Sequence, residues 1–134
     1  MKKILIIDDD KTFQKTMSDM LKTKGYDSIS AVDGEEGLIK AISENPDLIL
    51  LDIRMPKLDG MGFLQAINEK IGVKKIPILI TSNLEGIDKI SEGVAFGVKG
   101  YIIKSNETLG SIMKRVEENL NPNAKHEPEI IPVE

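Results

Sequence analysis

The fold is decided by residues 48–60, which read LILLDIRMPKLDG. Four consecutive apolar residues, 48–51, lead directly into the acid Asp52, and a proline and an Asp-Gly turn pair follow. A continuous apolar run is typical of a strand that is covered on both faces, as strands of a parallel sheet are. We therefore expect Asp52 at the carboxyl end of a buried parallel strand, with a loop beyond it.

Similar apolar runs recur along the chain. Residues 4–7, 78–80 and 101–103 are continuous, whereas residues 28–31 alternate polar with apolar, which is typical of a half-covered edge strand. Five strands alternating with five helices predict an α/β domain with a parallel sheet and helices on both faces. The apolar positions at helical spacing are Phe13, Met17, Met20 and Leu21; Leu38, Ala41 and Ile42; Leu64, Ile67 and Ile71; Ile87, Ile90 and Val94; and Leu109, Ile112, Met113, Val116 and Leu120.

Capping residues mark the helix boundaries. Asp10 is expected to cap the first helix, and Asp33 with Glu36 resembles a capping box for the second. Gly25 is placed to end the first helix, and the Asn-Pro pair at 45–46 to end the second. The methionines on the helices are expected in the core.

The last 14 residues differ from the rest. Residues 121–134 contain three prolines and no helical or strand period. We therefore predict a folded domain over residues 1–120 and a flexible tail, or a truncated linker, over residues 121–134.

The composition excludes several kinds of function. The 134-residue chain has 18 Lys and Arg against 22 Asp and Glu, a net charge of -4, no Cys, and a single His, His126. An acidic balance disfavours direct binding to nucleic acid or to an anionic membrane. Thiolate metal sites, disulfides and catalytic triads lack their residues. No apolar run approaches the roughly 20 residues that span a bilayer, so we expect a cytoplasmic protein.

The residues that could take part in catalysis or metal binding directly follow the expected strands. Asp8 and Asp9 follow the first, Asp52 the third, Thr81 the fourth and Lys104 the fifth. Ligands of open parallel sheets bind beyond the carboxyl ends of the strands, so these side chains are expected in one crevice. Clustered acids need a cation to stay ionised, and an all-oxygen ligand set favours Mg²⁺ or Mn²⁺. An aspartate beside such a metal can act as the nucleophile toward a phosphoryl group.

Four segments in order carry a family resemblance: ILIIDDD (4–10), LILLDIRMPKLDG (48–60), ILITS (78–82) and GYIIK (100–104). Together they resemble the receiver domain of two-component response regulators, in its single-domain, chemotaxis-regulator-like form. The resemblance implies a doubly wound, flavodoxin-like (βα)5 fold with strand order 2-1-3-4-5. It also implies a phosphorelay switch, with a sensor histidine kinase or histidine phosphotransfer protein as donor. The output would be a downstream target protein or a missing output domain.

The resemblance also assigns roles to the acidic residues. Asp52 matches the aspartate that accepts the phosphoryl group and forms an aspartyl phosphate. Asp8 and Asp9 match the acidic pair that holds Mg²⁺ together with Asp52. The backbone carbonyl of Arg54 matches the main-chain ligand of the metal.

The remaining matches concern the switch. Thr81 matches the hydroxyl that follows the phosphoryl group, and Lys104 matches the lysine that contacts it. Tyr101 matches the aromatic residue whose rotamer responds to the threonine. In the family this change moves the surface formed by the fourth helix, the fifth strand and the fifth helix, here about residues 84–120, which is the expected output surface.

Two positions depart from the family pattern. Ser105 follows Lys104 where family members usually have a proline with a cis bond, so this bond is either trans with a rearranged loop or cis at an energetic cost. Ser82 replaces a small apolar residue. Arg54 and Asn83 match positions that tune the lifetime of the phosphoryl group.

Two other functions remain open. A small Mg²⁺-dependent phosphatase or phosphotransferase with an aspartyl nucleophile needs a second acid for the leaving group and a cap for its substrate. A degenerate receiver would only bind partners. Taken singly, Lys104, Thr81 or Tyr101 is typical of an ordinary surface or strand residue. Their occurrence together with the acids, each after an expected strand, favours the signalling switch. Beyond its own phosphorylation and slow dephosphorylation, we expect no enzymatic activity.

Overall fold

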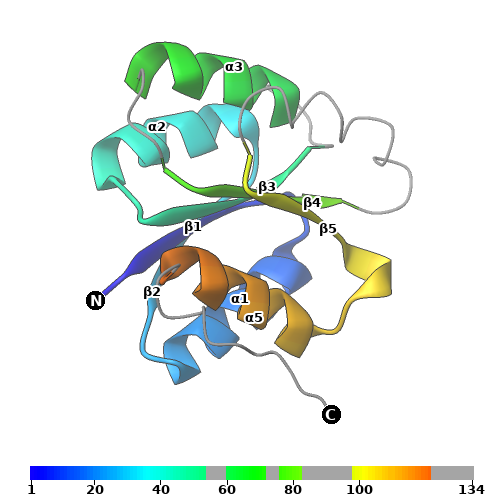
Figure 1. Cartoon of the computed structure of the whole chain (residues 1–134). Coiled ribbons are helices and arrows are strands. Elements are labelled where there is room, and N and C mark those ends of the chain that lie inside the picture. The colour runs from blue at the N-terminus through cyan, green and yellow to red at the C-terminus, as the bar shows by residue number, and fades with distance from the viewer. Residues whose placement is uncertain (54–59, 72–75, 83–97, 122–134) are drawn as a thin grey trace.

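The sheet is built as the sequence predicts. The computed structural model describes residues 1–53, 60–71, 76–82 and 98–121. Five parallel strands form one sheet in the order β2-β1-β3-β4-β5, which confirms the predicted strand order and places β2 at an edge (Figure 1). The strands are β1 (Lys3–Ile7), β2 (Asp27–Ala31), β3 (Leu48–Asp52), β4 (Ile78–Ser82) and β5 (Gly100–Ile103).

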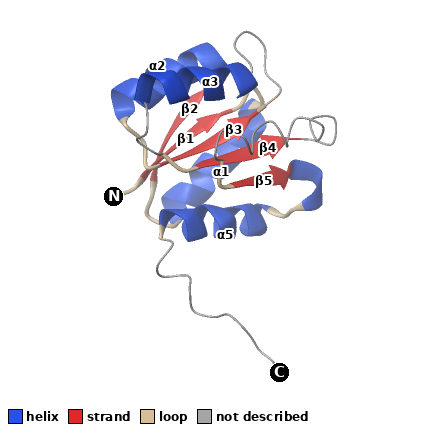
Figure 2. Ribbon diagram, turned by 45° about the horizontal axis from the view of Figure 1, so that its top comes forward, coloured by secondary structure: helices blue, strands red, loops and turns tan. Residues whose placement is uncertain are grey.

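Helices cover both faces of this sheet. Figures 1 and 2 show α2 and α3 over one face and α1 and α5 over the other. The bounds are α1 (Lys11–Thr23), α2 (Gly34–Glu44), α3 (Gly60–Ile71) and α5 (Leu109–Leu120), with a short 3₁₀ helix, η2 (Lys104–Asn106), after β5. In the described ranges no helix has the length and apolar character needed to cross a bilayer. The fourth predicted helix, with Ile87, Ile90 and Val94, lies outside the described residues, as does the predicted tail beyond Asn121.

The predicted caps are present. The Asp10 carboxylate accepts hydrogen bonds from the backbone N–H groups of Thr12 and Phe13, at 3.0 and 3.1 Å. Asp33 caps α2 by accepting from the Glu36 N–H at 2.9 Å, and the Glu36 carboxylate accepts from the Val32 N–H, one residue before the position that a strict capping box uses.

Residues with positive φ end the first two helices as predicted. Gly25, just after α1, has φ +88°, and Asn45, just after α2, has φ 50°. The left-handed region suits glycine and tolerates asparagine, so the chain leaves each helix at these positions.

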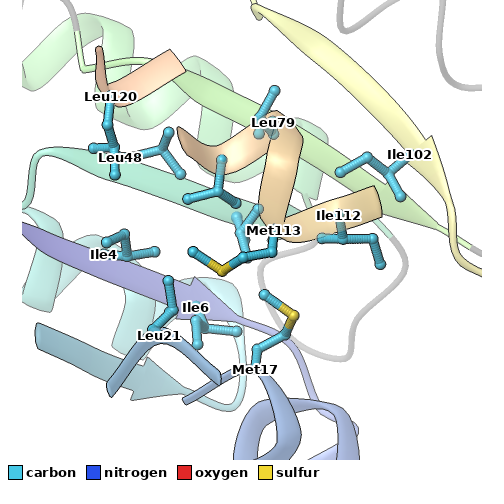
Figure 3. Close-up of a cluster of buried hydrophobic side chains, with 12 residues drawn as sticks. Ile4, Ile6, Met17, Leu21, Leu48, Leu79, Ile102, Ile112, Met113 and Leu120 are labelled. Carbon is cyan, nitrogen blue, oxygen red and sulfur yellow. The ribbon is translucent and has the colours of Figure 1, made fainter. Parts of the chain in front are cut away.

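Alternate residues of β1 divide the core into two layers. Ile4 and Ile6 belong to the cluster between the sheet and α1 and α5, whereas Leu5 and Ile7 belong to the cluster beneath α2 and α3. Figure 3 shows the first cluster, with Met17 and Met113 in its centre. The prediction that the helix methionines lie in the core is confirmed for both, and Met20 packs against this cluster. Its buried members are Ile4, Ile6, Met17, Leu21, Leu48, Leu50, Leu79, Ile102, Ile112, Met113, Val116 and Leu120.

One position of the predicted core is wrong. Ile42 was placed on the buried face of its helix, but its side chain is 50% exposed. The buried stripe of α2 runs through Gly34, Gly37 and Ala41, and Leu38 is partly buried. Small residues bring this stripe close to the sheet, and the rotation that buries Ala41 leaves Ile42 at the flank of the helix.

Gly37 allows α2 to pack tightly against the sheet, so a larger side chain there should lower stability. A Cβ there would lie 2.6 Å from Cδ1 and 2.9 Å from Cγ1 of the fully buried Ile7. We expect Gly37→Ala to lower the free energy of unfolding by about 1–2 kcal/mol, because overpacking outweighs the gain in helix propensity. Gly110→Ala is the matched control, since a Cβ at Gly110 meets only the Thr108 Oγ1, at 3.9 Å. Urea denaturation should show that Gly110→Ala leaves the free energy of unfolding unchanged or slightly raises it. An equal loss in both variants would contradict the packing explanation.

Candidate functional site

The strand register brings the predicted residues to one edge of the sheet. Asp52 at the end of β3 is the register partner of Thr81 on β4. Asp8 directly follows β1, and its N–H continues the ladder to β2 by donating to the Ala31 carbonyl at 3.0 Å. Lys104 directly follows β5. The strand arrowheads point to the same side of the molecule (Figure 2), so these residues share the carboxyl edge of the sheet.

The three aspartates form a candidate metal centre. Carboxylate oxygens of Asp8, Asp9 and Asp52 all lie within 4.8 Å of one another. Asp8 and Asp52 are buried, at 1% and 7% exposure, whereas Asp9 is exposed. Three carboxylates without an imidazole or a thiolate are a ligand set suited to a hard divalent cation. The centre could therefore hold such an ion with one side open to solvent.

Both oxygens of the Asp8 carboxylate have hydrogen-bond donors. The Asp10 N–H donates to Oδ1 at 2.9 Å, and the Lys104 ammonium donates to Oδ2 at 2.7 Å. Burial nevertheless raises the pKa of the Asp8 carboxyl above its ordinary value, because the hydrogen bond and charge of Lys104 only partly offset the loss of hydration. A buried anion with a raised pKa is a group that an added cation stabilises.

Lys104 has a second contact on α1. Its Nζ lies 4.3 Å from the centroid of the Phe13 ring. This distance is within the range of an attractive cation–π interaction. Lys104 thus reaches from the edge strand β5 across to the first turn of α1 and the end of β1.

Thr81 is buried without a hydrogen-bond partner for its hydroxyl. Its side chain is 1% exposed, and among the described residues its Oγ1 has no donor or acceptor within reach. An unsatisfied buried hydroxyl costs about 1–3 kcal/mol, so the Thr81 Oγ1 is a candidate to receive a partner when a ligand binds at this edge of the sheet. The neighbouring Ser82 is also buried, at 1% exposure.

The other predicted residues are placed as follows. Tyr101 lies on β5 with its side chain 46% exposed. The Lys104–Ser105 peptide bond is trans, and the chain enters the 3₁₀ helix η2 directly at Lys104. Of the two alternatives that the sequence left open, the structure therefore has the trans bond, followed by a 3₁₀ turn. Arg54 and Asn83 lie outside the described residues.

Two side chains that support the site were not predicted. Gln14, 8% exposed, donates from Nε2 to the carbonyls of Asp8 and Ala31 at 2.7 and 2.8 Å, which ties α1 to the ends of β1 and β2. Glu107 accepts from the Ser111 hydroxyl at 2.7 Å and the Arg115 Nε at 2.9 Å, which fixes the segment between Lys104 and α5. The sequence could have indicated Gln14 by its position, because it is a polar residue that borders the apolar face of α1.

Comparison with known proteins identifies relatives of the chain. Its sequence matches the response regulator receiver domain family over residues 4–117. It is 34% identical over 117 residues to the protein PilG of Pseudomonas aeruginosa, covering 85% of this chain and 87% of PilG. It is 36% identical over 122 residues to the alkaline phosphatase synthesis transcriptional regulatory protein PhoP of Bacillus subtilis, covering 87% of this chain and 50% of PhoP.

Solved structures agree with these relatives. The chemotaxis protein CheY4 of Vibrio cholerae superposes with a TM-score of 0.79 at 30% identity, covering 88% of this chain and 98% of CheY4. The chain spans about half the length of the transcriptional regulators it matches, such as PhoP, and nearly the whole of CheY4.

The raised pKa of Asp8 predicts a pH-dependent stability. A carboxyl whose pKa is higher in the folded state favours folding while it is protonated, and this contribution is lost as the pH rises through the folded-state pKa. We therefore expect metal-free Asp8→Asn to be more stable than the wild type at neutral pH, with the difference shrinking as the pH falls through the raised folded-state pKa and gone below the ordinary value of about 4. Chemical denaturation across this range measures it.

Asp19→Asn is the control for that experiment, because within the described residues the Asp19 carboxylate is exposed and pairs with Lys15 on α1. Its stability should follow the wild type at every pH. A difference between Asp8→Asn and the wild type that does not change with pH would contradict the assignment of the raised pKa to Asp8.

Proposed function

Because the chain belongs to the response regulator receiver family, we propose that it is a phosphorylation-dependent signalling switch with Asp52 as the phosphoacceptor. The observation that carries the proposal is the placement of Asp52, buried in the cluster with Asp8 and Asp9 and in register with Thr81. One Asp52 carboxylate oxygen attacks the phosphorus of a phosphohistidine donor, the phosphorus–nitrogen bond breaks, and the imidazole leaves with the electron pair. The product is an aspartyl phosphate.

The acidic cluster is the proposed Mg²⁺ site. Asp8, Asp9 and Asp52 supply carboxylate oxygens, and the backbone carbonyl of Arg54 is the proposed main-chain ligand. Mn²⁺ is an alternative ion for the same oxygen set. The ion supplies charge neutralisation for the phosphoryl oxygens when it is bound. The raised pKa of Asp8 supports the proposal, because a buried carboxylate that is only partly compensated by Lys104 gains from a second cation.

Lys104 and Thr81 are the proposed contacts of the transferred group. The Lys104 ammonium already lies at the edge of the cluster, 2.7 Å from Asp8, and stabilises the charge that develops on the phosphoryl oxygens. The buried Thr81 hydroxyl gains a hydrogen-bond acceptor when the phosphoryl group is attached to Asp52. Phosphorylation would therefore give a partner to a hydroxyl that has none among the described residues.

The signal is proposed to leave through β5. Tyr101 is half exposed on this edge strand, so its ring has room to change rotamer when Thr81 moves. The proposed output surface comprises the segment that includes β5 and α5. Phosphorylation changes the affinity of this surface for a partner by shifting a two-state equilibrium.

The proposed partners follow from the family. A sensor histidine kinase or a histidine phosphotransfer protein donates the phosphoryl group, and a target protein or an output domain receives the signal. We propose that these events take place in the cytoplasm. The chain acts on its own Asp52 and has no proposed activity on other substrates.

Intact-mass measurement tests the proposal directly. Incubation with acetyl phosphate and Mg²⁺, followed by an acid quench, should add a single phosphoryl group to the wild type and none to Asp52→Asn or to a sample with excess chelator. Asp10→Asn is the matched control, because asparagine caps α1 as well as aspartate does and Asp10 is not a member of the cluster. It should retain the adduct.

Other outcomes of that experiment favour the other functions. Turnover of a generic phosphate ester would favour a phosphatase or phosphotransferase. Absence of any adduct on the wild type would overturn the phosphoacceptor role and favour a receiver that only binds partners.

The metal site gives a separate prediction that does not depend on phosphorylation. Mg²⁺ at ten times its Kd should raise the free energy of unfolding by about 1.4 kcal/mol, since an ion that binds only the folded state stabilises it by mass action. Asp9→Asn should lose most of this gain, while Asp10→Asn should keep it. Denaturation with and without Mg²⁺ measures the difference, and an equal gain in both variants would place the ion elsewhere.

A further inference from the structure

We infer that Phe13 is a positioning residue, whose ring face holds the Lys104 ammonium at the acidic cluster for phosphoryl transfer. The inference rests on the proposed function, because the placement of Lys104 affects a rate only if Asp52 accepts a phosphoryl group. It adds a role for an aromatic side chain on α1 that sequence reasoning had placed in the core alone.

The contact itself is close and partly sheltered from solvent. The Lys104 Nζ lies 4.3 Å from the centroid of the Phe13 ring and 2.7 Å from the Asp8 Oδ2, so the ammonium has a π face as one neighbour and a carboxylate as another. The Lys104 side chain is only 21% exposed. A lysine ammonium is strongly hydrated in water, and its attraction to an aromatic face grows as water is removed.

The ring is fixed relative to the cluster. Phe13 is partly buried and packs against the core between the sheet and α1 and α5. Its N–H donates to the capping carboxylate of Asp10, and the next residue, Gln14, donates to the carbonyls of Asp8 and Ala31. The first turn of α1 is thereby tied to the end of β1, which fixes the backbone of Phe13 relative to Asp8, and packing against the core restrains its ring.

Lys104 needs such a contact because its backbone, placed by β5 and the 3₁₀ helix η2, does not by itself fix the position of the ammonium. Four rotatable bonds separate the Lys104 backbone from the ammonium, and fixing them carries an entropy cost. Among the described residues, the ammonium forms an ion pair with Asp8 and a cation–π contact with Phe13.

The contacts with Asp8 and Phe13 differ in how many N–H donors of the ammonium they leave free for the phosphoryl group. Asp8 occupies an N–H donor of the ammonium, and its carboxylate is also a proposed metal ligand. The Phe13 face attracts the positive charge without being a metal ligand or a competing carboxylate, so it can hold the ammonium while N–H donors turn to the phosphoryl oxygens. The ring therefore keeps Lys104 in place at the stage when Asp8 is shared with a cation.

Fluorination of the ring tests this role with little change in volume. Phe13 is replaced by phenylalanines carrying one, two and three ring fluorines, which progressively weaken the negative potential of the face. The rate of Asp52 phosphorylation by acetyl phosphate with Mg²⁺ should fall in the same order, by about three- to tenfold at three fluorines. Trifluorinated phenylalanine at Phe63, which is fully buried on α3, is the control and should leave the rate unchanged.

A second series separates an effect through Lys104 from a structural one. In a Lys104→Gln background the rate is lower, and the fluorinated Phe13 variants should show no further graded fall, because the cation is absent. The Hε protons of Lys104 should carry an upfield ring-current shift in NMR spectra of the wild type, and Phe13→Leu should remove it. This second readout does not require phosphorylation.

The outcomes are distinguishable. A graded fall that disappears in Lys104→Gln, together with the ring-current shift, supports the inference. If the wild type is phosphorylated but the rate is the same in all fluorinated Phe13 variants, the positioning role is overturned and the proposed function stands. The same holds if the graded fall persists in the Lys104→Gln background. If the wild type accepts no phosphoryl group, the proposed function and the positioning role are both overturned.

Discussion

The buried Asp8 carboxylate is the constraint on which the rest of the site depends. It is 1% exposed at the end of β1, where the sheet and α1 exclude the water that would hydrate its charge. A buried charge needs compensation, and here the Asp10 N–H and the Lys104 ammonium each occupy one of its oxygens. The compensation is incomplete, since the pKa of Asp8 is raised. Asp8 lies within 4.8 Å of carboxylate oxygens of Asp9 and Asp52 at the same edge of the sheet.

The folded state tolerates this partly compensated carboxylate because apolar clusters pack both faces of the sheet beneath it. Ile4 to Ile7 are all at 0% exposure, and two separate clusters pack the faces of the sheet. Proteins commonly retain strain or uncompensated charge at functional sites while the surrounding structure supplies the stability. In this chain the Asp8 carboxylate, which is only partly compensated, and the Thr81 hydroxyl, which has no partner among the described residues, both lie at the carboxyl edge of the strands. A bound cation would stabilise the carboxylate, and an attached phosphoryl group would give the hydroxyl an acceptor.

Lys104 connects distant parts of the fold to that edge. It leaves β5 at one side of the sheet and meets Asp8 and Phe13 at the end of β1 and the start of α1. Glu107, with Ser111 and Arg115, fixes the segment that joins Lys104 to α5. Lys104 therefore contacts the start of α1 and leads directly into the segment that joins β5 to α5. These contacts support the proposal that the site communicates with the surface near β5.

The sequence by itself determined the strands, the caps and the residues at the carboxyl edge. Continuous apolar runs that lead into Asp8, Asp52 and Lys104 set the elements, because burial on both faces requires such runs and parallel strands collect the residues that follow them. The caps at Asp10 and Asp33 were predictable because they depend on neighbouring backbone N–H groups.

Only the tertiary structure decided the contacts between elements. The exposure of Ile42 depends on how far α2 rotates over the sheet, and the pairing of Lys104 with Phe13 joins side chains 91 residues apart. The bridge from Gln14 to Asp8 and Ala31 likewise needs three elements in place. Periodicity gives the face of a helix to within a residue or so, whereas rotation and side-chain reach follow from packing against partners that the local sequence does not contain.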